Sequence, residues 1–246
     1  MSNRNFDLEA RDNSERLYRY GIDNIVRELF LDRISESDFK LNRGSRVLEI
    51  GSHDGSMTSQ ILNYVDKIDV LEPVLELHRQ IKESVGNNVE IFSGTIESSQ
   101  FGQEYDAIFL VHVLEHIDNP TEALKRISQW LKPTGYLYVM VPNANALSRQ
   151  LARSMGLMHE TTDVLPGEKL QGHLRTYSIE HLIGDAIQAN LRITHTGGIL
   201  HKPLANFQLD KCIEEGIIGQ DYLSALDDYA KKNPEEASSI FLIASN

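Results

Sequence analysis

The sequence contains a single cysteine, Cys212, among 246 residues. One cysteine excludes an intramolecular disulfide framework and any zinc module built from several thiolates. No apolar run is long enough to cross a bilayer, and the polar stretch from Met1 to Asn5 lacks the apolar centre of a signal peptide. The sequence therefore predicts a cytoplasmic protein.

Positive charge is also scarce, because 24 lysines and arginines stand against 36 acidic residues and give a net charge of −12. A field of that sign disfavours DNA, RNA and anionic membranes as partners. The length allows one large domain with a sizeable core. We therefore expect a small-molecule substrate, with no nucleic acid and no membrane as partner.

Short apolar runs alternate with amphipathic stretches along most of the chain. Strands that alternate with helices of this length predict an α/β fold with a parallel, doubly wound sheet. Ligands of such sheets bind beyond the carboxyl ends of the strands. The expected strands are 46–50, 67–71, 88–92, 105–111, 136–141, 191–196 and 239–244, and the expected helices include 75–85, 121–131 and a helix that follows Ser178.

The stretch 47–56, VLEIGSHDGS, has the pattern of a strand, a tight turn and the start of a helix. Gly51 and Gly55 allow the turn to take positive φ and to approach a ligand closely. Glu72 ends the second strand about 20 residues later, where nucleotide-binding α/β folds read ribose hydroxyls. The turn lacks one glycine of the dinucleotide fingerprint, and the acid Glu49 before it would repel phosphate. These features favour a cationic ligand.

This stretch resembles motif I of the class I methyltransferases that use S-adenosyl-L-methionine (SAM), with His53 at the family's middle glycine. The resemblance covers roughly residues 44–142 and the closing strands. It implies a Rossmann-like, seven-stranded sheet whose last strand is antiparallel between strands five and six. It also implies SAM as cofactor and S-adenosyl-L-homocysteine as product. The cofactor contacts that it implies are Glu49, Gly51, Ser52, His53, Gly55, Glu72, Pro73, Thr95, Ile96, Val111 and His112.

Two long stretches interrupt the alternation of strands and helices. We expect a helical N-terminal cap at 1–43 and a methyltransferase domain at 44–246. Insertions are expected at about 143–177, where the family carries a substrate lid, and at about 203–238, which reads as helical and acidic. The resemblance brings Tyr18, Arg19 and Tyr20 of the cap near the methionyl carboxylate. The second insertion either packs on the domain or forms the face of a homodimer.

Two histidines are the candidate catalytic bases. An oxygen acceptor needs its proton removed, and a histidine suits that task. His116 follows the fourth strand, where a structural histidine bonded within its turn is the alternative, and His173 lies in the lid. Arg175 is expected to anchor phosphate or carboxylate, unless the nearby acids pair with it. His159 and Tyr177 complete the predicted substrate site.

A divalent metal is an alternative use of the same histidines. His112, Glu115 and His116 have the spacing of one helical face, and His173 could complete the set. Some O-methyltransferases with a similar Glu-x-x-Glu-His stretch bind such an ion, but here a histidine replaces the first acid. Because three ligand-type residues at helical spacing are a weak motif, the sequence alone assigns no metal site.

The function hypothesis that follows is a SAM-dependent methyltransferase. Its acceptor is expected to be small and polar, either anionic or linked to a sugar or nucleotide, and methylated on oxygen. The alternatives are an N-methyltransferase of a small amine and a catalytically inactive, cofactor-binding regulatory protein, because fold alone does not decide function. The set Glu49, Gly51, Gly55 and Glu72, together with a polar lid, favours the enzyme.

Overall fold

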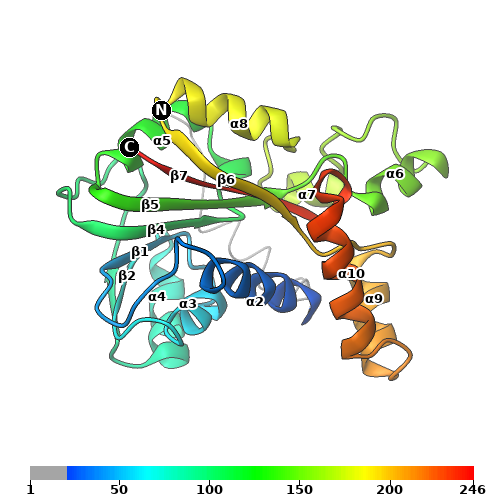
Figure 1. The fold of residues 1–246 in the computed structure, drawn as a ribbon, viewed down its shortest axis with the longest axis horizontal. Coiled ribbons are helices and arrows are strands. Elements are labelled where there is room, and N and C mark those ends of the chain that lie inside the picture. Colours follow the sequence, from blue (N-terminus) through cyan, green and yellow to red (C-terminus); the bar gives the residue numbers. More distant parts are fainter. Residues whose placement is uncertain (1–20) are drawn as a thin grey trace.

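The computed structural model describes residues 21–246, so the predicted contacts Tyr18, Arg19 and Tyr20 lie outside the described residues. Seven strands of this part form one sheet in the order β3-β2-β1-β4-β5-β7-β6 (Figure 1). β7 runs antiparallel to both of its neighbours, whereas the pairs among β1 to β5 are parallel. The predicted Rossmann-like sheet with an antiparallel last strand is confirmed. The strands are β1 (Val47–Ile50), β2 (Ile68–Leu71), β3 (Val89–Phe92), β4 (Tyr105–Val111), β5 (Leu131–Pro142), β6 (Arg192–Ile199) and β7 (Ser239–Ser245).

Helices cover both faces of the sheet. One face carries α2 (Gly21–Ser35), α3 (Ser56–Ile61) and α4 (Leu75–Val85), and the other carries α5 (Pro120–Ser128) and α8 (Ile179–Gln188) (Figure 1). Successive residues of a strand point to opposite faces, so each central strand supplies both cores. Ile108 and Leu110 of β4 belong to the core that includes α5 and α8, whereas Ala107 and Phe109 belong to the core that includes α2 and α3. Burial on both faces explains why these strands read as continuous apolar runs.

Both predicted insertions leave the sheet at the carboxyl ends of parallel strands, and Figure 1 shows them on the same side of the molecule. The first contains α6 (Leu147–Ser154) and α7 (Pro166–Leu170). The second contains α9 (Asn206–Glu214), α10 (Gln220–Lys232) and the 3-10 helix η2 (Pro234–Glu236). The predicted helical character of the second insertion is correct.

The second insertion packs against helix α2. A side-chain oxygen of Asp210 in α9 accepts from the backbone N–H of Gly21, and the other accepts from Ile22, each at 2.8 Å. Arg33 of α2 forms an ion pair of 2.9 Å with Asp227 of α10, and both side chains are largely buried. The cap and the insertion therefore stabilise each other.

One boundary each of β5 and β6 differs from the prediction, because glycine residues let these strands pair with their neighbours over more residues than expected. Residues 132–135, between the expected helix and the expected strand, form an irregularity within β5, which already begins at Leu131. There, a Cβ on Gly135 would lie 2.7 Å from the carbonyl oxygen of Tyr105. β6 continues to Ile199 because Gly197 and Gly198 keep pairing with β7 at places with no room for a side chain.

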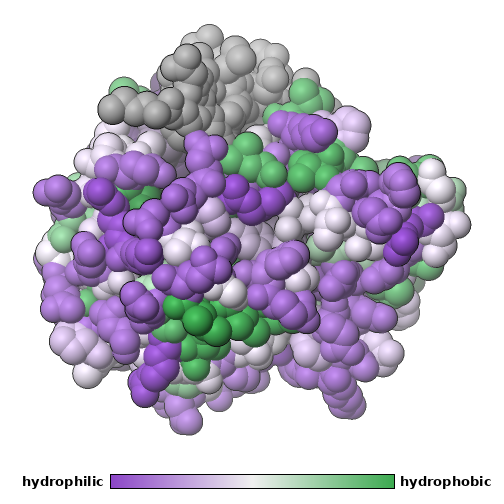
Figure 2. All heavy atoms as spheres, turned by 90° about the horizontal axis from the view of Figure 1, so that it is seen from above, coloured by the Kyte–Doolittle hydropathy of each residue, from purple (hydrophilic) through white to green (hydrophobic). Residues whose placement is uncertain are grey.

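The face seen in Figure 2 is mostly hydrophilic, with limited apolar patches. Among residues 21–246, none of the helices combines the length and the apolar character that a membrane span requires. Phe207 and Ile217 of the second insertion are 60% and 74% exposed. A homodimer through this insertion stays a prediction.

Candidate functional site

The turn after β1 is built from residues in the left-handed region. The φ angles are 75° at Gly51, 54° at His53 and 80° at Gly55. His53 adopts a conformation that residues with a side chain rarely take, which explains how it replaces a glycine here. A Cβ on Gly51 would lie 2.6 Å from Cγ2 of Val113. The glycine at position 51 is therefore required by packing as well as by φ.

Glu72, at the end of β2, holds this turn in place. One of its oxygens accepts from the backbone N–H of His53 and the other from that of Val74, each at 3.0 Å. Burial raises the pKa of this carboxyl, and the two N–H groups oppose that rise. A carboxylate has about four acceptor positions, so capacity remains for the two ribose hydroxyls of a nucleoside. The remaining acceptor positions of Glu72 therefore fit the ribose hydroxyls of the predicted cofactor.

Glu49 and Ser52 form a buried network beneath the turn. Oε2 of Glu49 accepts from the hydroxyl of Thr58 at 2.5 Å, and that hydroxyl oxygen lies 2.6 Å from Oγ of Ser52. Burial raises the pKa of Glu49 to about 7. A carboxyl in this environment is stabilised in its ionised form by a nearby cation, such as the amine or sulfonium of SAM.

The other predicted cofactor contacts follow the carboxyl ends of neighbouring strands. Pro73 is half-buried beside Glu72. After β3, the N–H of Thr95 donates to Oγ of Ser98 at 2.9 Å, and Ile96 is buried beside a pocket of about 510 Å³. Val111 ends β4. These positions share one edge of the sheet, and their contact with the cofactor stays a prediction.

The predicted helical face of His112, Glu115 and His116 is wrong. His112 has a φ of 55°, and only Leu114–His116 form a short 3-10 helix, η1. The backbone N–H of His112 donates to the carbonyl of Met140 in β5 at 2.8 Å, which holds this residue beside the neighbouring strand rather than in a helix. Its Nδ1 nevertheless lies 3.7 Å from a carboxylate oxygen of Glu115.

Two cations that the sequence analysis missed act on this end of the site. Burial lowers the pKa of His112 well below 6.5, and the positive charges of Arg27 and Lys202 lower it further. Lys202 follows β6; its side chain is 13% exposed, and its Nζ donates to Asn206 at 2.9 Å. Lys202 could have been predicted, because it lies just beyond the end of a strand. Nothing in the sequence indicated Arg27, which lies within a helix.

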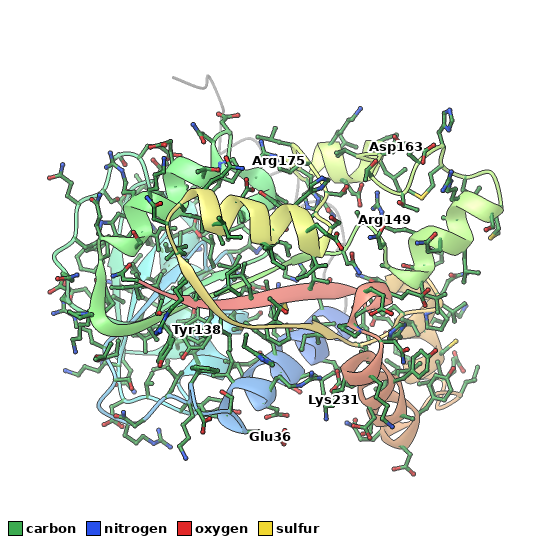
Figure 3. The ribbon with its side chains drawn as sticks, turned by 45° about the horizontal axis from the view of Figure 1, so that its top comes forward. Glu36, Tyr138, Arg149, Asp163, Arg175 and Lys231 are labelled. Carbon is green, nitrogen blue, oxygen red and sulfur yellow. The ribbon has the colours of Figure 1, made fainter. Side chains whose placement is uncertain are left out.

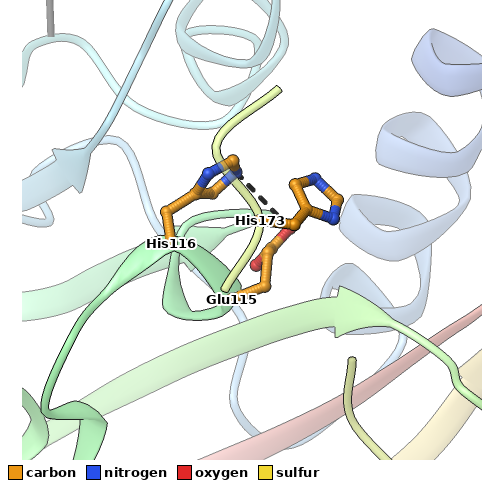
Figure 4. Close-up of side chains that lie close together, drawn as sticks. All are labelled: Glu115, His116 and His173. Atoms are coloured by element: carbon orange, nitrogen blue, oxygen red, sulfur yellow. Dashed lines mark ion pairs between the residues drawn. The ribbon is translucent and has the colours of Figure 1, made fainter. Parts of the chain in front are cut away.

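The two candidate bases lie together with Glu115. The rings of His116 and His173 meet edge to face with centroids 4.7 Å apart, and Nε2 of His116 lies 3.9 Å from Oε1 of Glu115 (Figure 4). The returning lid segment is fixed by the N–H of Leu174, which donates to the carbonyl of Glu115 at 3.0 Å. The structure therefore brings together residues that stand 57 positions apart in the sequence.

The carboxyl of Glu115 is only 1% exposed, and neither of its oxygens accepts a hydrogen bond from the described residues. Burial raises its pKa to about 8. A buried ionised carboxylate that accepts no hydrogen bond is costly. At neutral pH this group therefore holds a proton or binds a cation.

Arg175, predicted to anchor the acceptor, forms contacts within the protein. Its guanidinium donates to two backbone carbonyls just after η1, one of them at 3.0 Å. These hydrogen bonds tie the lid to that turn. The side chain of His159 is 91% exposed on the outer surface of the insertion. Tyr177 is 1% exposed, and its hydroxyl donates to Asp185 of α8 at 3.0 Å. The contact of these three residues with an acceptor stays a prediction.

The other basic residues of the first insertion are also used locally. Arg149 donates to the carbonyl oxygens of Thr161 and Asp163 and forms an ion pair with Glu168 (Figure 3). Arg153 pairs with the exposed Glu160 at 3.4 Å. The charges of Arg149 and Arg153 are therefore paired with acids of the same insertion.

Known proteins with similar sequences are methyltransferases. The family model "Methyltransferase domain" matches residues 18–196. The ubiquinone biosynthesis O-methyltransferase of Aeromonas salmonicida is 25% identical over 178 residues, which cover 70% of this chain and 73% of that protein. The (S)-coclaurine N-methyltransferase of Papaver somniferum is 27% identical over 118 residues, 46% of this chain and 32% of that protein.

The matched stretch is shorter in some relatives. The mitochondrial ubiquinone biosynthesis O-methyltransferase of Schizosaccharomyces pombe is 25% identical over 114 residues, so this chain spans less than half of its length, 42%.

Solved structures share the fold at low sequence identity. A methyltransferase solved in complex with the Trm112 activator of Haloferax volcanii has a TM-score of 0.63 and 13% identity, covering 100% of this chain and 99% of its own. A SAM-dependent methyltransferase from Thermotoga maritima has a TM-score of 0.63 and 17% identity, with coverages of 96% and 97%. Because the family model matches most of the chain and the sheet order agrees, this chain belongs to the methyltransferase-domain family, and its fold is that of the class I SAM-dependent methyltransferases.

Proposed function

We propose that this enzyme transfers the methyl group of SAM to an oxygen atom of a small polar acceptor. The observation that carries the proposal is the contact between His116 and His173, just beyond the carboxyl end of β4. An oxygen acceptor requires help with its proton, and this pair of rings is placed to give it. The relatives named as ubiquinone biosynthesis O-methyltransferases support oxygen as the acceptor atom.

The cofactor supplies an activated methyl group and the sulfur leaving group when it is bound. The residues of this chain would bind and orient it. Glu72 would accept from the ribose hydroxyls while His53 and Val74 hold its carboxylate in position. Glu49, buried beneath the turn, would place negative charge near the cationic end of the ligand.

One of the two histidines would take the acceptor's proton on a ring nitrogen. Each ring restricts the rotation of the other, which favours one orientation toward the acceptor. Only a neutral imidazole can act as base, so turnover should rise with pH until that ring has lost its proton.

The acceptor we propose is polar and carries a hydroxyl group. The anchoring role expected of Arg175 is no longer part of the proposal. Positive charge is supplied instead by Arg27 and Lys202, which act on the nearby His112. Such charge would favour a hydroxyl that readily ionises, or an anionic group beside it.

Methylation of a small amine is the second candidate, favoured by the similarity to the coclaurine N-methyltransferase. An amine needs only to be neutral, so it depends less on a base. Panels of phenols, hydroxy acids and amines, offered with methyl-labelled SAM and analysed by mass spectrometry, separate the two candidates. Labelled ethers or esters would support the proposal. Labelled amines alone, with His116→Ala and His173→Ala variants fully active, would overturn it.

A further inference from the structure

The carboxyl of Glu115 is 1% exposed, and neither of its oxygens accepts a hydrogen bond from the described residues; its neighbours are the imidazoles of His112 and His116, at 3.7 and 3.9 Å. A buried polar group without a hydrogen bond costs about 1–3 kcal/mol, and more when it is charged. Structural acids in proteins usually avoid this cost, as Glu72 does by accepting two backbone N–H groups. A carboxylate left in this state beside two imidazoles indicates a ligand that the protein binds there.

The donor set around Glu115 is that of a transition-metal site. One ligand-type atom from each of Glu115, His116 and His173 lies within 4.8 Å of the other two. Nε2 of His116 is 3.9 Å from Oε1 of Glu115, and Nδ1 of His112 is 3.7 Å from the same oxygen. Ligands about 2.1 Å from one ion are separated by roughly 3–3.5 Å in regular geometries, so small side-chain rotations would close the site.

The chain is arranged so that these donors converge. Glu115 and His116 stand on the single turn of η1, directly after β4, and the lid returns His173 to the same place through the bond between Leu174 and Glu115 (Figure 4). Two imidazoles and one carboxylate select Zn²⁺, Mn²⁺, Co²⁺ or Fe²⁺ over Ca²⁺ and Mg²⁺, which prefer sets made only of oxygen.

We propose that Glu115, His116 and His173 bind one divalent transition-metal ion, with at least one coordination position left open toward the acceptor. Its binding is independent of the acceptor's identity, whereas its catalytic use rests on the proposed O-methylation. An acceptor hydroxyl bound at the open position would lose its proton to water more readily. Its oxygen would then bond to the methyl carbon as the carbon–sulfur bond breaks and the electron pair stays on sulfur. With the ion bound, both histidines are ligands, and the ion takes over from a histidine base the task of helping the acceptor lose its proton; oxygen remains the acceptor atom.

The test uses the whole chain after treatment with a chelator. Titration with Co²⁺, followed by visible absorption, and calorimetry with Zn²⁺ and Mn²⁺ measure binding without any methyl transfer. We expect one equivalent of ion, with a rise in the melting temperature. Glu115→Gln and His173→Ala should each weaken binding at least tenfold. His159→Ala, whose ring is exposed on the same insertion, is the matched control and should leave binding unchanged.

The opposite results are equally clear. If the buried carboxyl simply holds a proton, the ions will leave the melting temperature unchanged and Glu115→Gln will bind them as the wild type does; either result overturns the site. Because Glu115→Gln keeps the shape of the side chain, its folding can be checked by circular dichroism. Stoichiometric binding without methylation of any hydroxyl acceptor would leave the metal site standing and remove the proposed function.

Discussion

Glu49 couples its own ionisation to the stability of the fold. Its unfolded carboxyl has a pKa near 4.5, and burial raises the folded value to about 7. Between these values the unfolded chain has lost the proton that the folded chain still holds, so the free energy of unfolding falls as pH rises through this window. Below pH 4.5 and above pH 7 the contribution is constant.

The predicted loss from this group is at most about 3 kcal/mol between pH 4.5 and 7. Urea unfolding of the cofactor-free protein and of Glu49→Gln, measured across this range, isolates it. As pH rises, the unfolding free energy of the wild type should fall relative to that of Glu49→Gln. A difference that does not depend on pH would show that Glu49 is ionised in the fold.

A second prediction at this scale concerns cofactor affinity. Glu72→Ala should weaken binding of S-adenosyl-L-homocysteine by about 1.5–3 kcal/mol, the range for hydrogen bonds to a charged group. Calorimetry measures the loss, with Glu83→Gln on the exposed side of α4 as control. Because Glu72 also holds the N–H groups of His53 and Val74, the variant's fold is checked by its thermal transition. Normal affinity in a folded variant would refute the ribose contact.

The packing of Gly51 gives a third prediction. Gly51→Ala combines left-handed strain of about 1–2 kcal/mol with a contact of 2.6 Å to Val113. Gly156 has a similar φ of 73° and nothing within 4 Å of its added Cβ, so Gly156→Ala should suffer the strain alone. In urea unfolding Gly51→Ala should lose clearly more stability, and Val113→Ala should recover part of it. Equal losses in the two glycine variants would show that the clash relaxes.

At the scale of elements, the first insertion depends on Arg149. Its guanidinium is 12% exposed at the side chain and bonds Thr161, Asp163 and Glu168 at once. Arg149→Ala should lower the free energy of local opening of the first insertion by on the order of 1–3 kcal/mol, which raises the population of the open form. Limited proteolysis, with mass spectrometry of fragments cut within 155–170, measures this opening. Arg153→Ala, which removes an exposed pair, should be cleaved at the wild-type rate.

The strands could be predicted because local chemistry determines them. Largely apolar runs such as 105–111 have few alternatives to a strand that is buried on both faces. Glu72 lies at the end of its strand, where an acid that binds a ligand is expected. The partners of the lid's cations could not be predicted, because Arg149 meets an acid 19 positions away that only the folded insertion selects. The left-handed φ of His112 likewise comes from its bond to the neighbouring strand, not from its own sequence context.

At the scale of the whole molecule, one acid connects three distant parts. Asp227 of α10 pairs with Arg33 of α2 and accepts from the backbone N–H of Leu200, just after β6, at 3.1 Å. Removing one partner of a buried pair costs about 3–5 kcal/mol. Asp227→Ala should therefore lose several kcal/mol in urea unfolding. Asp228→Ala, whose pair with Lys231 is exposed, should lose less than about 1 kcal/mol. Similar losses in both variants would contradict this connecting role.

The place of β7 in the sheet affects how the molecule is assembled during translation. Among residues 21–246, β7 is the one sheet partner of β6, and all seven residues of β7 are buried between β5 and β6. About forty residues separate the end of β6 from the start of β7. At roughly 5–20 residues per second, the ribosome needs about 2–8 s to supply them. During that interval the unpaired N–H and C=O groups at the edges of β5 and β6 can pair with other chains and cause aggregation. Chaperone access to the nascent chain should therefore govern the yield of soluble enzyme.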